Sequence, residues 1–162
     1  GLVDDRFFTE ESRRRGEFVH KACHYYDEGD LDPSSVSPII LGYLSAWIAF
    51  KRDSKFEPEQ IEKPVYSALY GFAGTPDRVG KMGWPGSGRA IIDIKSGVAI
   101  PVTALQVAGY SICLPDPGGW KRYSVQLKDD GTYKLREYKD RTDRAVFLAA
   151  LAVLNWKSNN GG

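Results

Sequence analysis

Apolar residues recur about every 3.6 positions in the first third of the chain, and this spacing predicts two helices. The first is predicted over 10–28, because Thr9 can cap its start, acidic residues follow the cap, and Gly29 can end it. The second is predicted over 38–52, because Ser37 followed by a proline is typical of a helix start.

The apolar period changes to two after Pro58, which indicates β-strands. Strands are predicted in succession over 60–67, 69–79 and 89–95, as an antiparallel meander. A stretch rich in glycine, at 83–88, is predicted to be the loop between the last two of them.

The rest of the chain changes from helix to strands and back to helix. A helix is predicted to open at Pro101, and a hairpin of strands over 123–127 and 133–138 follows it. A last helix is predicted to end near Trp156. We expect both Trp47 and Trp156 in the core, because each lies on the apolar stripe of its helix.

The composition is that of a folded α/β protein, with 162 residues, 22 Lys+Arg, 21 Asp+Glu and a net charge of +1. We expect one domain over residues 1–157 and a disordered tail over 158–162. The near-neutral charge argues against a protein that coats long stretches of duplex by counterion release. It leaves room for a local basic groove.

Apolar runs and cysteines exclude further classes of protein. The longest apolar run, 145–154, is shorter than the ~20 residues of a membrane span, so we expect no membrane partner. Two cysteines, Cys23 and Cys113, are too few for a disulfide framework or an iron–sulfur cluster. They favour a reducing, cytoplasmic compartment.

The most informative local pattern is Asp93-Ile94-Lys95 on a predicted strand. Asp93 and Lys95 share one face of that strand, because alternate side chains point the same way. Asp77 lies on the preceding strand, and an antiparallel pair places it beside Asp93. Adjacent carboxylates repel unless a hard divalent cation lies between them, so the pair predicts a Mg²⁺ or Mn²⁺ site. The alternative is an exposed Asp–Lys pair on an edge strand.

These residues resemble the PD-(D/E)XK nuclease superfamily, in which two acids precede a lysine in this order. Two further elements are similar to its RecB-like branch: Arg15-Gly16 followed by His20 on an early helix, and Gln106 with Tyr110 after the lysine strand. The resemblance implies a restriction-endonuclease-like core, with a central mixed sheet of about five strands flanked by helices.

The resemblance also implies roles for individual residues. The metal ligands would be His20, Asp77, Asp93 and the carbonyl of Ile94. Lys95 would position or deprotonate the attacking water and offset charge on the phosphate. The residues expected to contact nucleic acid are Gln106, Tyr110 and Arg15.

Other candidate site residues have both a functional and a structural interpretation. Glu62 is expected either to steer the lysine or a second metal, as a supporting catalytic residue, or to be an exposed acid on an edge strand. Trp84 either stacks on a DNA base or anchors the glycine-rich loop. His24 is expected at the surface. Tyr110 could instead pack in the core.

The expected activity is that of a Mg²⁺- or Mn²⁺-dependent deoxyribonuclease, and the favoured form is an exonuclease on DNA ends in recombination or repair. The resemblance points to small stand-alone phage or prophage exonucleases, with single-stranded DNA or duplex ends as the partner and no iron–sulfur cluster. The alternatives are a non-catalytic DNA-binding or assembly module and an endonuclease of the same superfamily. The oligomeric state stays open.

Overall fold

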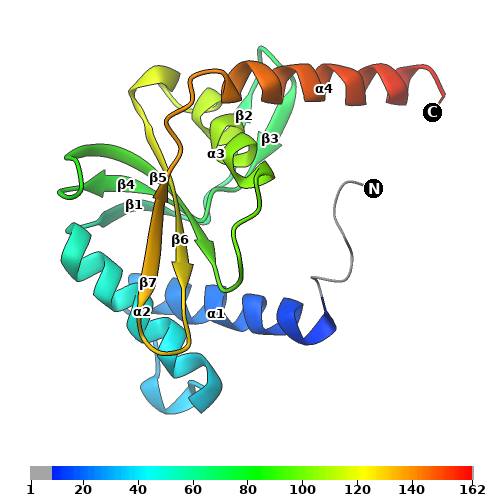
Figure 1. The fold of residues 1–162 in the computed structure, drawn as a ribbon. Helices are drawn as coiled ribbons and strands as arrows, with labels where there is room; N and C mark the ends of the chain where they lie inside the picture. Colours follow the sequence, from blue (N-terminus) through cyan, green and yellow to red (C-terminus); the bar gives the residue numbers. More distant parts are fainter. Residues whose placement is uncertain (1–8, 162) are drawn as a thin grey trace.

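A five-stranded mixed β-sheet forms the centre of the computed structural model, which describes residues 9–161. Its strands are ordered β1-β4-β5-β6-β7, and β5 and β6 run parallel while the other neighbours are antiparallel (Figure 1). This confirms the predicted α/β class with its five-stranded mixed sheet flanked by helices. The strands are β1 Glu57–Ile61, β4 Arg78–Met82, β5 Gly88–Lys95, β6 Lys121–Leu127 and β7 Tyr133–Glu137.

Two helices cover one face of the sheet. They are α1 (Glu10–Glu28) and α2 (Pro38–Ser54), joined through the short 3-10 helix η2 (Pro33–Ser35). Thr9 caps α1 by accepting a hydrogen bond from the Ser12 amide, as its sequence predicts. Apolar side chains from both helices pack against alternate residues of the central strands, including Ile92 and Ile94. Trp47 is fully buried in this core, as predicted.

The other face of the sheet is covered by α3 (Val102–Ile112), which carries the chain from β5 across to the parallel strand β6. Val107 packs there against Val79 and Ile91. Successive side chains of β5 point to opposite faces of the sheet. Asp93 is two residues after Ile91, so it lies on the same face as Ile91, the face that α3 covers. The short 3-10 helix η3 (Pro117–Gly119) precedes β6.

Two predicted strands are wrong in their extent. The stretch 60–67 divides into the end of β1 and a separate strand, β2 (Val65–Ser67), because Glu62 adopts a positive φ of 47° and Pro64 follows. The stretch 69–79 divides into β3 (Phe72–Gly74) and β4. A proline at position 76 separates them. The strands β2 and β3 pair with each other outside the main sheet.

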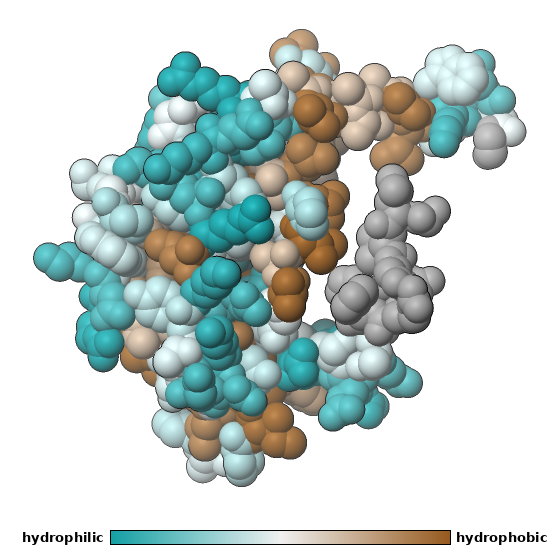
Figure 2. Space-filling view, in the orientation of Figure 1, coloured by the Kyte–Doolittle hydropathy of each residue, from teal (hydrophilic) through white to brown (hydrophobic). Residues whose placement is uncertain are grey.

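The last helix, α4 (Asp143–Asn159), also departs from expectation. Ser158 and Asn159, assigned to a disordered tail by sequence, continue the helix. Trp156 is 66% exposed and not in the core, because α4 packs through its first half on α3 and then extends away from the sheet (Figure 1). Hydrophobic side chains line the exposed helix (Figure 2).

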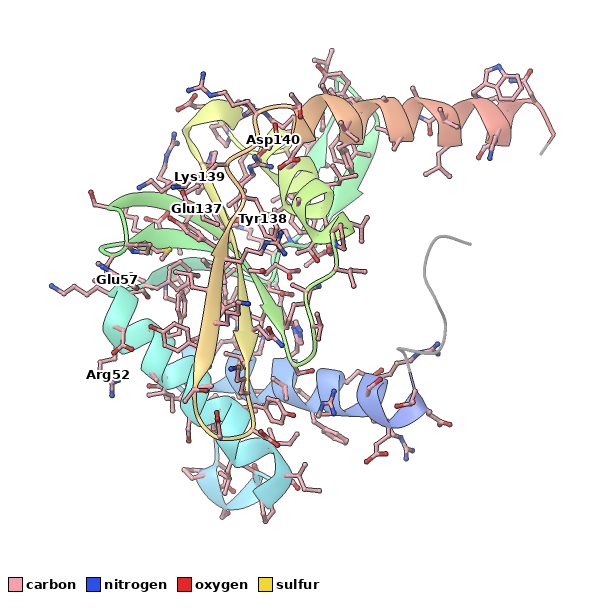
Figure 3. All side chains as sticks on the ribbon, in the orientation of Figure 1. Arg52, Glu57, Glu137, Tyr138, Lys139 and Asp140 are labelled. Atoms are coloured by element: carbon pink, nitrogen blue, oxygen red, sulfur yellow. The ribbon has the colours of Figure 1, made fainter. Side chains whose placement is uncertain are left out.

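The start of α4 is fixed by a buried arginine on the sheet. Arg122 on β6 donates hydrogen bonds to the Asp143 carboxylate at 2.9 Å and to the Asp140 carbonyl at 2.6 Å. Tyr138 lies between β7 and this helix (Figure 3). Its hydroxyl shares a hydrogen bond of 2.9 Å with the Ser124 hydroxyl. The helix therefore begins at a defined place even though its second half is exposed.

Among the described residues, 9–161, no helix combines the length and the apolar character that crossing a membrane requires.

Candidate active site

The pairing of three strands aligns three carboxylates at one end of the sheet. Ile61 of β1 is paired with Arg78 of β4, and Arg78 is paired with Ile92 of β5. The next positions along this line are Glu62, Asp77 and Asp93. The Glu62 amide continues the pattern by donating a hydrogen bond to the Asp77 carbonyl at 3.0 Å. The expected adjacency of the two aspartates is therefore present.

The buried Asp93 pairs with the partly exposed Lys95 on the face covered by α3. Asp93 is 3% exposed, and Lys95 Nζ donates a hydrogen bond of 3.2 Å to its Oδ1. Asp93 Oδ2 lies 3.1 Å from the same ammonium group but accepts no aligned hydrogen bond. Since β5 lies between β4 and β6, the alternative of an exposed edge pair is wrong.

Burial governs the ionisation of Asp93. It raises the pKa of Asp93 to about 6, the negative charge of Asp77 adds to the shift, and Lys95 opposes it. Burial disfavours the ionised form of this carboxylate, and one of its oxygens lacks a hydrogen-bond partner. A cation bound beside it would therefore stabilise the ionised form.

Asp77 is held in place by the backbone of β5 and by α1. Its Oδ2 accepts a hydrogen bond of 2.6 Å from the Ile94 amide. Its Oδ1 lies 3.4 Å from Nδ1 of His20 on α1. The carboxylate is thus fixed between the lysine strand and the histidine helix, with 18% of its side chain exposed.

His20 responds to this acidic environment. Burial alone would lower the pKa of His20, but the contact with Asp77 and the charges of Asp77, Asp93 and Glu62 outweigh burial and raise it. A cation that bound here would have to displace the proton from the imidazole, since only the neutral ring is a ligand.

Tyr110, with its partner Gln106 on α3, lies near the carboxylates of Asp77 and Asp93. Gln106 Nε2 donates a hydrogen bond of 2.9 Å to the Tyr110 hydroxyl. Burial raises the pKa of Tyr110, and the nearby charges of Asp77 and Asp93 raise it further. The ring packs on Gly74, where a Cβ would lie only 2.6 Å from Tyr110 Cε1. A side chain at position 74 would therefore displace the tyrosine.

Sequence reasoning missed a buried ion pair behind the site. Arg78 follows Asp77 directly, is 0% exposed, and donates a hydrogen bond of 2.7 Å to Asp27 of α1. Lys51 and the Trp47 indole of α2 donate to the same carboxylate. The pair joins the helix that carries His20 to the strand that follows Asp77. Only the three-dimensional fold brings positions 27 and 78 together.

We expect Asp27→Asn to lower the free energy of unfolding by about 3–5 kcal/mol, because it leaves the buried Arg78 charge without its partner. Urea unfolding of both proteins at one pH measures the difference. Asp53→Asn is the matched control, since Asp53 pairs with the exposed Arg52 and such pairs contribute about 1 kcal/mol or less. Equal losses in the two variants would contradict a stabilising role for the Asp27 network.

Two residues predicted to contact nucleic acid, Trp84 and Arg15, lie outside the strand ends that carry the carboxylates. Trp84 is 54% exposed in the turn between β4 and β5, at the opposite end of these two strands from Asp77 and Asp93. Both interpretations of Trp84, a ring that stacks on a DNA base and an anchor of the glycine-rich loop, therefore stay predictions. Arg15 lies over the ring of Tyr43 on α2, with 5.9 Å between its guanidinium carbon and the ring centroid.

Glu62 and His24 lie next to each other at the rim of the site. Glu62 Oε2 is 3.0 Å from His24 Nδ1, although no aligned hydrogen bond joins them. Nε2 of His24 lies 3.2 Å from Glu28, one turn further along α1. His24 is therefore partly enclosed by acids, and Glu62 is no free edge-strand acid.

The side chains present fit a hard divalent cation that keeps water ligands. Within residues 9–161, no three His, Cys, Asp or Glu side chains converge into a ready-made metal cage. Mg²⁺ does not need one, because proteins hold it through one or two carboxylates with several waters. Asp77 and Asp93 supply two carboxylates, and Asp93 Oδ2, which accepts no aligned hydrogen bond, offers a buried oxygen.

The raised pKa of Asp93 predicts how metal-free stability depends on pH. Between the unfolded pKa near 4 and the folded pKa of about 6, the folded protein binds more protons, so stability falls as pH rises through this window. The whole loss amounts to about 3 kcal/mol for a two-unit shift, of which about 2 kcal/mol falls between pH 4.5 and 7.5. Urea unfolding in EDTA at pH 4.5 and 7.5 tests it. Asp93→Asn, which has no such proton to release, should show a smaller drop, and an identical drop would contradict the assignment.

Comparison with known proteins supports the fold. No model of a known protein family matches the chain. No curated protein matches it either. Among solved structures, a protein of Eubacterium rectale described as a "putative exonuclease" is 12% identical, with a TM-score of 0.59 over 96% of this chain and 71% of that chain. The protein SSO0001 is 17% identical with a TM-score of 0.41, over 87% of this chain and 68% of that chain. The first likeness shows a shared fold and the second carries no argument.

Proposed function

We propose that this protein is a Mg²⁺- or Mn²⁺-dependent DNA nuclease of the PD-(D/E)XK type, similar to its RecB-like branch. The observation that carries the proposal is the meeting of Asp77, directly before β4, with Asp93 and Lys95 of β5, where Asp93 is buried and one of its oxygens accepts no aligned hydrogen bond. The shared fold with the Eubacterium rectale protein, and that protein's description as an exonuclease, support the same reading.

The proposed ligands are Asp77, Asp93, His20 and the carbonyl of Ile94. When bound, the metal would polarise the scissile phosphate and lower the pKa of a water ligand. Lys95, paired with Asp93 at 3.2 Å, would then offset negative charge that develops on the phosphate during attack. Tyr110, oriented by Gln106, would contact the DNA backbone beside the carboxylates.

An exonuclease on DNA ends is the favoured form of this activity. Its test is to incubate the purified protein with end-labelled single-stranded and duplex DNA, linear and circular, in Mg²⁺, Mn²⁺ or EDTA. We expect metal-dependent release of nucleotides from linear DNA and none from circles. Cleavage of circles would identify an endonuclease instead. Binding without any metal-dependent product would leave a non-catalytic DNA-binding module.

A further inference from the structure

One exposed stripe of α1 alternates cations with aromatic rings. Its members recur at intervals of four, three and four residues, so they fall within about 60° of one another around the helix. Phe18 is 58% exposed and Tyr25 is 40% exposed, and both cations are exposed as well. We call these residues the basic-aromatic stripe: Arg14, Phe18, Lys21 and Tyr25.

This stripe borders the candidate active site. A hollow of about 510 Å³ is lined by stripe residues Phe18, Lys21 and Tyr25 together with His20 and Glu62. A second hollow, of about 890 Å³, lies on the other side of the stripe against η2 and α2. The same two rings and Lys21 line both hollows, so the stripe forms the ridge between them.

We propose that the basic-aromatic stripe is the track on which single-stranded DNA is held as it enters or leaves the site, an inference that rests on the proposed nuclease function. Two rings on the same face of a helix can stack on bases, and the cations that alternate with them can pair with the phosphates. Duplex DNA keeps its bases paired and stacked inside, so it cannot use the rings in this way. The stripe therefore predicts that a single strand binds more tightly than a duplex.

The charges around the stripe limit how the strand can run. Glu11 lines the second hollow and Glu17 the first, and both are exposed. These carboxylates flank the stripe on its two sides and would repel phosphates, so the backbone must pass along the stripe itself, over Arg14 and Lys21. A strand held this way lies along the helix axis, where stacking and charge pairing alternate.

The test is the binding of fluorescent oligo-dT by anisotropy in EDTA, where no cleavage occurs. Phe18→Ala with Tyr25→Ala should weaken binding by about 30-fold or more, given the contribution of two stacked bases. The exchange Phe18→Tyr with Tyr25→Phe keeps both rings and should bind as the wild type does. Tyr66→Ala with Leu69→Ala removes apolar groups that are even more exposed, on a different part of the surface, and is the matched control.

The cations are tested through salt dependence. Arg14→Gln with Lys21→Gln should reduce the slope of log affinity against log salt by about 1.4, since each single-strand phosphate contact contributes about 0.7. This cation variant also tests the track if the variant without the two rings fails to fold. Poly-glutamate should compete poorly, because it offers charge without bases.

The outcomes separate this inference from the proposed function. Wild-type binding in the ring-deleted variant, equal affinity for duplex, or equal competition by poly-glutamate would overturn the track. Metal-dependent cleavage could still stand in those cases. Conversely, loss of binding in the ring-deleted variant supports the track even if no DNA is cleaved, and the absence of cleavage would then contradict only the nuclease.

Discussion

Lys95→Ala is expected to slow DNA cleavage by about 100- to 1,000-fold while DNA affinity changes little. The Nζ of Lys95 lies 3.2 Å from Asp93 Oδ1, so its charge stays at the site where negative charge would build on the phosphate. A group that acts mainly in the transition state lowers the rate and leaves ground-state binding nearly intact. Its side chain is 29% exposed, so its removal should not unfold the protein.

Single-turnover cleavage beside an equilibrium titration on the same oligonucleotide measures both effects. Lys81→Ala is the matched control, because Lys81 on β4 is exposed and pairs with Glu59 away from the carboxylates. A Lys95→Ala protein that binds DNA poorly but cleaves at the wild-type rate when saturated would contradict a catalytic role for the lysine.

Asp93→Asn is expected to abolish measurable cleavage and to weaken Mn²⁺ binding by more than about 100-fold. Loss of a group that merely supports a metal ligand costs about 10- to 100-fold in affinity, so loss of a charged ligand should cost more. The same change should raise the stability of the metal-free protein at pH 7.5, because it removes a buried charge repelled by Asp77.

Calorimetric titration with Mn²⁺ and urea unfolding in EDTA test the two parts of this prediction together. Asp130→Asn is the matched control, since Asp130 is an exposed turn residue that accepts hydrogen bonds from Thr132. Wild-type Mn²⁺ affinity in the Asp93 variant would place the metal site elsewhere. A less stable metal-free variant would show that Asp93 serves the fold and not the site.

The sequence predicted the features that depend on short-range pattern. The two first helices, with Thr9 and Gly29 at the ends of α1, follow from local capping chemistry. The adjacency of Asp77 and Asp93 follows from a hairpin whose loop is rich in glycine. Such features are encoded within about 20 residues of chain, which is why alternation and turn residues were enough to find them.

Features that depend on packing between distant segments could not be predicted. The Asp27–Arg78 pair joins residues that no local pattern relates. Trp156 carries the same apolar signal as Trp47, yet only Trp47 has a sheet to pack against. The breaks in the two predicted strands could have been found from the sequence, because Pro64 and Pro76 lie inside them and proline interrupts a strand.

The central claim is that Asp77, Asp93 and Lys95 form the centre of a metal-dependent nuclease. Its most direct test is the release of labelled nucleotide from a linear single-stranded oligonucleotide in Mn²⁺, by wild type and by Asp77→Asn purified in the same way. The account predicts release by the wild type that stops in EDTA and is absent from the variant. Equal release by both proteins, or none by the wild type in either metal on any form of DNA, would contradict it.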